Sequence, residues 1–459
     1  MKRTWTSQFV WYNEGQGILE LDPPRGVRVA WTAAQSVAGH TFIAVRPLPE
    51  EPLGGDLGIL LEFFRKPTIV GMDISGRAVR ATTNGRTNPV DADDPDEGWI
   101  TLRVQEIECS APALAIASFR LALSNISQET PPDALWTVEG IGLTVSPAPA
   151  YEEVVSALAT RDRFGHTAYL SVATNDRVHA VRLAETTCAL LSVISGCRVS
   201  WLHLEGLDVS GVVTHMWVSN AITGKFQNLP LIDEARRWDV VAEHWQRFSE
   251  FYSAHRLHAR RLIGLILNAT ADDDFLEVRG AKLATTIDAL ITVVVGDSVP
   301  TGFATRKERA AFRDAVQVHV EAEAKARLVD DTKGTTGDKE HRIAELKQKV
   351  NNLLNPTFRQ RISEAHRALR LDMDADQVRR FVRSRNELVH EARFVCQCDA
   401  PPNDWPYQSP ADEYFAMLLF VDRLLLRTIG YRGPFVDRSA RDGALAPAEP
   451  PFEVDRTPT

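Results

Sequence analysis

The sequence predicts a multidomain α+β protein in which strands come first and helices follow. The chain has 459 residues, more than one hydrophobic core usually holds, so roughly two or three domains are expected. Short alternating apolar runs fill residues 1–150, whereas apolar residues at helical spacing dominate after residue 235. Residues 151–235 mix both patterns. We therefore expect a β-rich domain, a mixed α/β segment and an all-α bundle.

Residues 1–150 are predicted to form a β-sandwich or a barrel-like sheet. Clusters of Pro, Gly and Asp separate short runs that alternate in polarity or are rich in β-branched residues, a pattern typical of both folds. The clearest runs are Gly17–Leu21, Gly26–Ala30, Thr41–Val45 and Trp99–Val104. This region contains no Gly-rich nucleotide-binding fingerprint.

Residues 151–235 are predicted to hold one helix, Arg177–Ser195, followed by a hairpin. The two strands of the hairpin are Cys197–Leu204 and Gly211–Val218, with a Gly-containing turn between them. His203 and His215 are metal ligands if they face each other across the hairpin, and ordinary strand residues otherwise. The second alternative is the commoner one.

Residues 236–438 are predicted to be helical, and the Pro- and Ala-rich residues 439–459 to form a flexible tail. Gly430 is expected to end the last helix. The expected helices are Trp238–Arg256, His258–Ala269, Phe275–Val295, Thr305–Leu328, Glu340–Leu354, Thr357–Leu371, Ala375–Val395 and Pro410–Ile429.

Composition indicates a soluble cytoplasmic protein with no metal or other cofactor. Hydrophobic content is 44% and charged content 25%, and no apolar run of about eighteen residues would cross a membrane. The first residues lack the apolar run of a signal peptide, and five scattered cysteines fit reduced thiols. Cys396 and Cys398 are too close together for a usual zinc pair, and no second pair accompanies them.

The formal charge of −9 argues against nucleic-acid binding over the whole surface. Between Lys339 and Arg393, however, basic residues outnumber acidic ones by about five. A local basic surface on an acidic protein suits a phosphate-bearing substrate that binds at one place, although exposed arginines are often merely solvated. The arginines of this stretch are Arg359, Arg361, Arg367, Arg370, Arg379, Arg380 and Arg383.

The helix Ala375–Val395 carries the residues with the clearest chemical meaning. Its apolar stripe is predicted to consist of Val378, Phe381, Val382, Leu388, Val389 and Ala392. Arg385 falls inside this stripe, where a charge is costly unless another group pairs with it. Asn386 and His390 lie about 100° and 140° round the helix from Arg385. An arginine, an amide and an imidazole together suit phosphate binding and proton transfer.

The succession Arg385, Asn386, three residues and His390 resembles the catalytic signature of the HEPN superfamily of metal-independent ribonucleases. Ser409-Pro410 and a long apolar helix that ends in Leu424–Tyr431 follow, and this order is similar to the Apea-like branch found in bacterial anti-phage (abortive infection) systems. The resemblance covers about the last third of the chain. It implies a helical HEPN-like core at about residues 275–435.

The resemblance also implies a mechanism that uses the substrate's own 2′-hydroxyl as the nucleophile. His390 would be the acid–base group and Arg385 the cation over the phosphate, with products that carry a 2′,3′-cyclic phosphate and a 5′-hydroxyl. Asn386 would either fix the His390 ring or hold a phosphate oxygen. Family members often place an acidic residue on the first helix of the domain. Asp288 has a similar context here and would pair with Arg385 or His390, although the usual family residue is Glu. The alternative is that Asp288 faces solvent.

One histidine per chain implies a homodimer or higher homo-oligomer, because strand scission needs both an acid and a base. The first hypothesis is therefore an RNA endonuclease that acts in defence, with a phage-derived trigger recognised by the N-terminal domain. The first alternative is a non-catalytic HEPN module that binds RNA or a nucleotide and works through dimerisation or assembly. The second alternative is a scaffold in which the β-rich domain is the working part.

Overall fold

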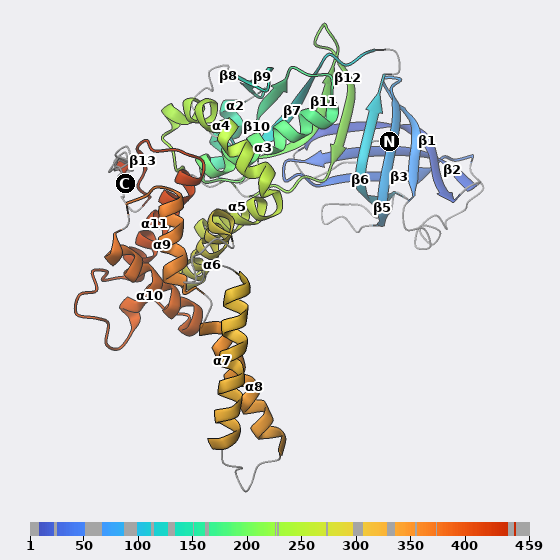
Figure 1. Ribbon diagram of the computed structural model, residues 1–459. Helices are drawn as coiled ribbons and strands as arrows, with labels where there is room; N and C mark the ends of the chain where they lie inside the picture. Colours follow the sequence, from blue (N-terminus) through green and yellow to red (C-terminus); the bar gives the residue numbers. More distant parts are fainter. Residues whose placement is uncertain are drawn as a thin grey trace. The chain divides into compact units, whose positions relative to one another are not determined.

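The computed structural model describes residues 9–22, 25–50, 67–86, 99–111, 114–126, 134–149, 151–160, 165–224, 226, 229–271, 274–296, 306–327, 336–353, 356–372, 374–438 and 445–446 (Figure 1). The chain forms two compact units. The N-terminal unit comprises Met1–Arg256 with Gly433–Ala448, and the helical unit comprises Leu257–Arg432 with Glu449–Thr459. The predicted segments 1–150 and 151–235 thus share one unit. The second unit begins at Leu257, about twenty residues later than expected.

The first six strands of the N-terminal unit close into an antiparallel barrel. They are β1 (Phe9–Asp22), β2 (Arg25–Ser36), β3 (Thr41–Pro47), β4 (Thr68–Asp73), β5 (Ala78–Arg86) and β6 (Ile100–Ser110). Their order is β3-β2-β1-β4-β5-β6, and pairing of β3 with β6 completes the circle. The β-rich prediction for this region is confirmed, in its barrel form.

Alternation along the strands of the barrel separates its interior from its exterior. Leu19 on β1 and its partner Ile69 on β4 are fully buried, whereas the neighbouring pair Ile18 and Val70 is exposed. Gly17 pairs with Gly71 one step along, where an added Cβ on Gly17 would lie 2.9 Å from the Gly71 Cα. The two strands approach too closely there for any side chain, which explains the glycine pair.

The sheet continues past β6 as an open antiparallel sheet in the order β12-β11-β7-β10-β9-β8. These strands are β7 (Ser118–Ser124), β8 (Ala134–Val138), β9 (Ile141–Pro147), β10 (His166–Val172), β11 (Ser200–Leu207) and β12 (Val213–Ser219). The helices α2 (Tyr151–Thr160), α3 (Arg177–Ser195) and α4 (Arg237–Ala254) pack on it, α2 against β10 and α3 against β11 and β7. Because α4 packs on α3 and β8, it belongs to this unit.

The predicted hairpin forms, but its two histidines do not face each other. His203 pairs with Val218 and His215 pairs with Gly206, and the ring of His215 stacks on Trp217. The register therefore excludes a shared metal site across this hairpin. In the described part of the chain, no group of three or more His, Cys, Asp and Glu residues is arranged to hold a metal ion.

The helix α3 is the one described helix that is long and apolar enough to cross a membrane. Its most apolar window is 67% buried within the protein, which is the behaviour of a core helix. Residues 433–438 return to the N-terminal unit, where the Val436 amide donates to the Leu231 carbonyl. β13 (Phe435–Val436) pairs there with β14 (Leu445–Ala446). The remainder of the predicted tail 439–459 lies outside the described residues.

The helical unit confirms the prediction of a C-terminal helical region. Its elements are α5 (Arg256–Thr270), α6 (Leu276–Val295), α7 (Arg306–Arg327), α8 (Thr336–Leu353), α9 (Phe358–Ala368), α10 (Ala375–Glu391), the short η3 (Val395–Gln397) and α11 (Pro410–Thr428). The apolar helix α6 contacts α9, α10 and α11, whereas α7 and α8 pack on each other as a hairpin (Figure 1). The helix α6 is therefore the centre of the bundle.

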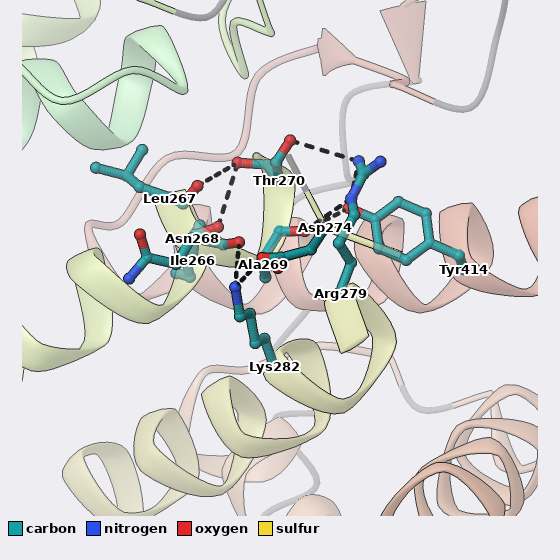
Figure 2. A network of polar contacts seen from close by, with 9 residues as sticks. All are labelled: Ile266, Leu267, Asn268, Ala269, Thr270, Asp274, Arg279, Lys282 and Tyr414. Atoms are coloured by element: carbon teal, nitrogen blue, oxygen red, sulfur yellow. Dashed lines mark hydrogen bonds and ion pairs between the residues drawn. The ribbon is translucent and has the colours of Figure 1, made fainter. Parts of the chain in front are cut away.

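Polar contacts fix the turn between α5 and α6 and tie α11 to it (Figure 2). Arg279 of α6 donates to the carbonyls of Ala269 and Thr270 and to the Tyr414 hydroxyl, which itself donates to the Ala269 carbonyl. Lys282 donates to the Asn268 carbonyl. Cations at the end of α5 offset the partial negative charge of its unpaired carbonyls.

Candidate functional site

The helix α10 has a clear sequence signal at its start and ends at Glu391 without one. The Asp374 side chain caps its start by accepting from the amides of Asp376 and Gln377. At its end, Ala392 adopts the left-handed conformation with φ of 53°. The motif residues Arg385, Asn386 and His390 therefore all lie within one regular helix, on its last two turns.

The packing face of α10 is rotated from the one that the sequence predicts. The buried residues are Val378, Phe381, Ser384 and Leu388. Val389 is 46% exposed and Ala392 is exposed, so the prediction that both pack is wrong. At about 100° per residue, Val389 falls about 80° from Phe381, outside the narrow contact. The small Ser384 is 1% exposed on this face, whereas 23% of the Arg385 side chain is open to solvent.

Arg385 lies at the margin of this face, where three groups contact its guanidinium. Its Nη2 lies 3.3 Å from Oδ2 of Asp288 on α6. Its Nη1 donates to Oδ1 of Asn386 at 3.2 Å, and its Cζ lies 5.1 Å from the centre of the Phe358 ring on α9. Of the two motif residues expected as partners for Asp288, the structure places Arg385 beside it. The shorter side chain of Asp reaches because α6 and α10 are in direct contact.

A second arginine shares the same carboxylate. Nη1 of Arg361 on α9 lies 3.7 Å from Oδ1 of Asp288, and its Nη2 donates to the Thr292 hydroxyl at 2.7 Å. The sequence indicated Arg361 only as one of several basic residues. No sequence signal places Arg361 beside Asp288, because this contact depends on how α9 packs against α6.

His390 does not take part in this cluster. Its side chain is exposed, and it has no hydrogen-bond or ion-pair partner within the described ranges. Asn386 accepts from Arg385 and makes no hydrogen bond to the His390 ring in this structure. The structure therefore brings together Arg385, Asn386 and Asp288, and it leaves His390 open to solvent on the last turn of α10.

Much of the predicted basic surface is neutralised by neighbouring carboxylates. Arg367 pairs with Glu364, Arg379 with Asp376 and Asp404, and Arg380 with Asp374. The remaining exposed arginines of the group are Arg359, Arg370 and Arg383, which have no ion pair within 4 Å among the described residues. Within residues 356–372 and 374–393, the structure thus shows three unpaired arginines and the Arg361–Arg385 pair, and not a continuous basic face.

A buried carboxylate fixes the segment that follows the motif helix. Glu413 of α11 is 0% exposed and accepts from the backbone amides of Val395 and Cys396 and from the Trp405 indole, each at 3.1 Å. The sequence did not predict this contact, because its partners lie in η3 and in the loop between η3 and α11, where no residue pattern indicates it. Burial, together with the Glu413 charge, raises the pKa of the neighbouring Cys396 thiol to about 12. This thiol is therefore neither a ready metal ligand nor a reactive nucleophile.

Comparison with known proteins found no relative of this chain. No family model, no curated protein and no solved structure matches it. The basis for a functional assignment is therefore the geometry of the residues themselves. Asp288, Arg361 and Arg385 form a partly exposed cluster of two cations on one anion, supplied by α6, α9 and α10. Such a cluster keeps a net positive charge and can bind an anion.

Proposed function

We propose that the helical unit is a metal-independent RNA endonuclease of the HEPN type. In this proposal Arg385 binds the scissile phosphate and His390 is the general acid–base. The observation that carries the proposal is the contact between Asp288 and Arg385, an acidic residue of α6 and a motif residue of α10 that lie 97 positions apart in the sequence. The exposed position of His390 on the same helix also supports it, because an acid–base group must reach the substrate.

The chemistry of the proposal needs few protein groups because RNA carries its own nucleophile. Deprotonation of the 2′-hydroxyl lets its oxygen attack the adjacent phosphorus, and protonation of the 5′-oxygen lets that group leave. Imidazole suits proton transfer because its ordinary pKa is about 6.5. A guanidinium suits the phosphate because its planar fork clasps two oxygens and stays charged. Asp288 and Phe358 hold that fork in place.

We further propose a homodimer in which two α10 helices share one cleft. Each chain supplies one histidine at the motif, whereas the reaction needs a base and an acid. His390 and the neighbouring Val389 are both exposed on α10, so a second copy can approach them without unfolding the helix. The N-terminal unit is proposed to sense a phage-derived trigger in the cytoplasm, with the nuclease as the defence effector.

The test is cleavage of total cellular RNA by purified protein in EDTA, followed by analysis of the product ends. The parent should give 2′,3′-cyclic phosphate and 5′-hydroxyl ends, and His390→Ala should lose about 10²–10⁴-fold in rate, the usual contribution of an acid–base group. His319→Ala is the matched control, because His319 is also an exposed histidine on a helix of this unit. Equal rates for the parent and His390→Ala would refute the role of His390.

The same experiment separates the proposal from a non-catalytic RNA-binding module. Such a module would bind RNA and leave its length unchanged in the parent and in both variants. Sedimentation of the parent over a range of concentrations tests the dimer. A chain that cleaves RNA while it remains monomeric would contradict the shared cleft.

A further inference from the structure

Asp288 joins two guanidinium groups that come from different helices. One oxygen of its carboxylate faces Arg385 of α10 at 3.3 Å, and the other faces Arg361 of α9 at 3.7 Å. All three side chains are partly exposed, with 23% of Arg385, 29% of Arg361 and 34% of Asp288 open to solvent. The two arginines are therefore accessible to solvent. Together with Asp288 they carry one net positive charge.

Each arginine is also held by a second neutral contact. Arg361 donates to the Thr292 hydroxyl, and that hydroxyl donates to the Asp288 carbonyl one turn earlier on α6. Arg385 rests against the Phe358 ring of α9. These contacts fix the direction of both guanidinium groups before any ligand arrives. Preorganised cations bind an anion more tightly than flexible ones, since less conformational entropy is lost.

We infer that Arg361 is a second phosphate-binding residue of this site, for the backbone of a single-stranded RNA. Asp288 is the positioning residue that keeps the two guanidinium groups on one side of α6. The inference rests on the proposed function, and it extends the site from α10 to α9. Arg361 contacts the phosphate backbone through the guanidinium N–H groups that Asp288 and Thr292 leave free, while Arg385 contacts the scissile phosphate.

The test measures binding of a fluorescent single-stranded RNA oligomer with 2′-O-methyl sugars, a probe that the proposed mechanism leaves uncut because it has no free 2′-hydroxyl. Affinity is measured from low to moderate salt for the parent, Arg361→Gln and Arg261→Gln. Arg261 is the matched control, because it is an exposed arginine of α5 with no hydrogen bond or ion pair in the described part of the unit. Both variants lose the same charge.

For Arg361→Gln, the inference predicts roughly tenfold weaker binding than the parent. The slope of log affinity against log salt should fall by about 0.7, the value for one phosphate contact on a single strand. Arg261→Gln should keep the parental slope. Arg361→Lys retains the positive charge and is the most conservative of these substitutions, so it should recover part of the affinity for the probe. Asp288→Asn should weaken binding too, although it removes a negative charge, because the guanidinium groups lose their common anchor.

The outcomes separate this inference from the proposed function. If the parent cleaves RNA but Arg361→Gln binds the probe as Arg261→Gln does, with the same slope, the inference is overturned and the proposed function stands. If the parent cuts no RNA, but Arg361→Gln binds the probe more weakly than the parent does, the proposed endonuclease activity is overturned and the phosphate contact stands. Tighter binding by Asp288→Asn would show that Asp288 competes with the phosphate, and would overturn its positioning role.

Discussion

Replacing Arg385 by alanine should lower the stability of the helical unit by about 1–2 kcal/mol. The change removes an ion pair with Asp288 at 3.3 Å and a cation–π contact with Phe358 at 5.1 Å. Because 23% of the arginine and 34% of the aspartate side chain are exposed, solvent screens the pair, so it contributes about 0.2–1 kcal/mol. The ring contact contributes about 0.5–1 kcal/mol.

The assay is urea unfolding followed by helical circular dichroism, with Arg385→Ala, Asp288→Ala and the double variant in one cycle. We expect a coupling free energy of about 0.2–1 kcal/mol, which should decrease at high salt. Arg385→Lys should recover part of the stability but little cleavage, because a point charge replaces the fork. A coupling of zero at low salt would refute the contact, and with it the geometry of the site.

Two further predictions concern buried groups. Glu413→Ala should destabilise the helical unit by about 3 kcal/mol, because one buried donor and two partly buried donors lose their acceptor, at about 1–3 kcal/mol for a fully buried donor and less for the other two. Denaturant unfolding measures this change, and a loss below about 1 kcal/mol would contradict it. In the N-terminal unit, burial lowers the pKa of His166 to about 4. The unfolded chain, in which this pKa is about 6.5, then binds more protons between the two values, so stability should fall by about 3 kcal/mol as the pH drops through that window. His166→Gln should flatten the curve of unfolding free energy against pH in this window. An unchanged curve would show that His166 does not cause this pH dependence.

The sequence predicted the local structure of the barrel but not its closure. Alternation along each strand is a local property, and it identified the runs around Gly17–Leu21 and Thr41–Val45 correctly. Pairing of β3 with β6 is a long-range contact, with Phe42 opposite Arg103, and no periodicity within either strand reports it. For the same reason, the sequence did not show that β7–β12 continue the sheet of the barrel.

The candidate site was predictable where a residue pattern existed. The motif on α10 pointed to Arg385, and the resemblance pointed to Asp288. The rotation of the packing face by a fraction of a turn was not predictable, because Ser384 and Arg385 are neighbours and tertiary contacts decide which of them is buried. The contact of Arg361 with Asp288 depends on how α9 lies against α6, which the sequence of α9 does not encode by itself.

The most direct measurement of the proposed function is cleavage of one short RNA, and of the same oligomer with a single 2′-deoxy sugar at the cut site, with and without EDTA. We predict that the RNA is cut at the same rate in EDTA, because the proposed mechanism uses His390 and Arg385 and requires no metal ion. The 2′-deoxy oligomer should stay intact, since it lacks the nucleophile. Loss of cleavage in EDTA, or equal cutting of both oligomers, would contradict the mechanism.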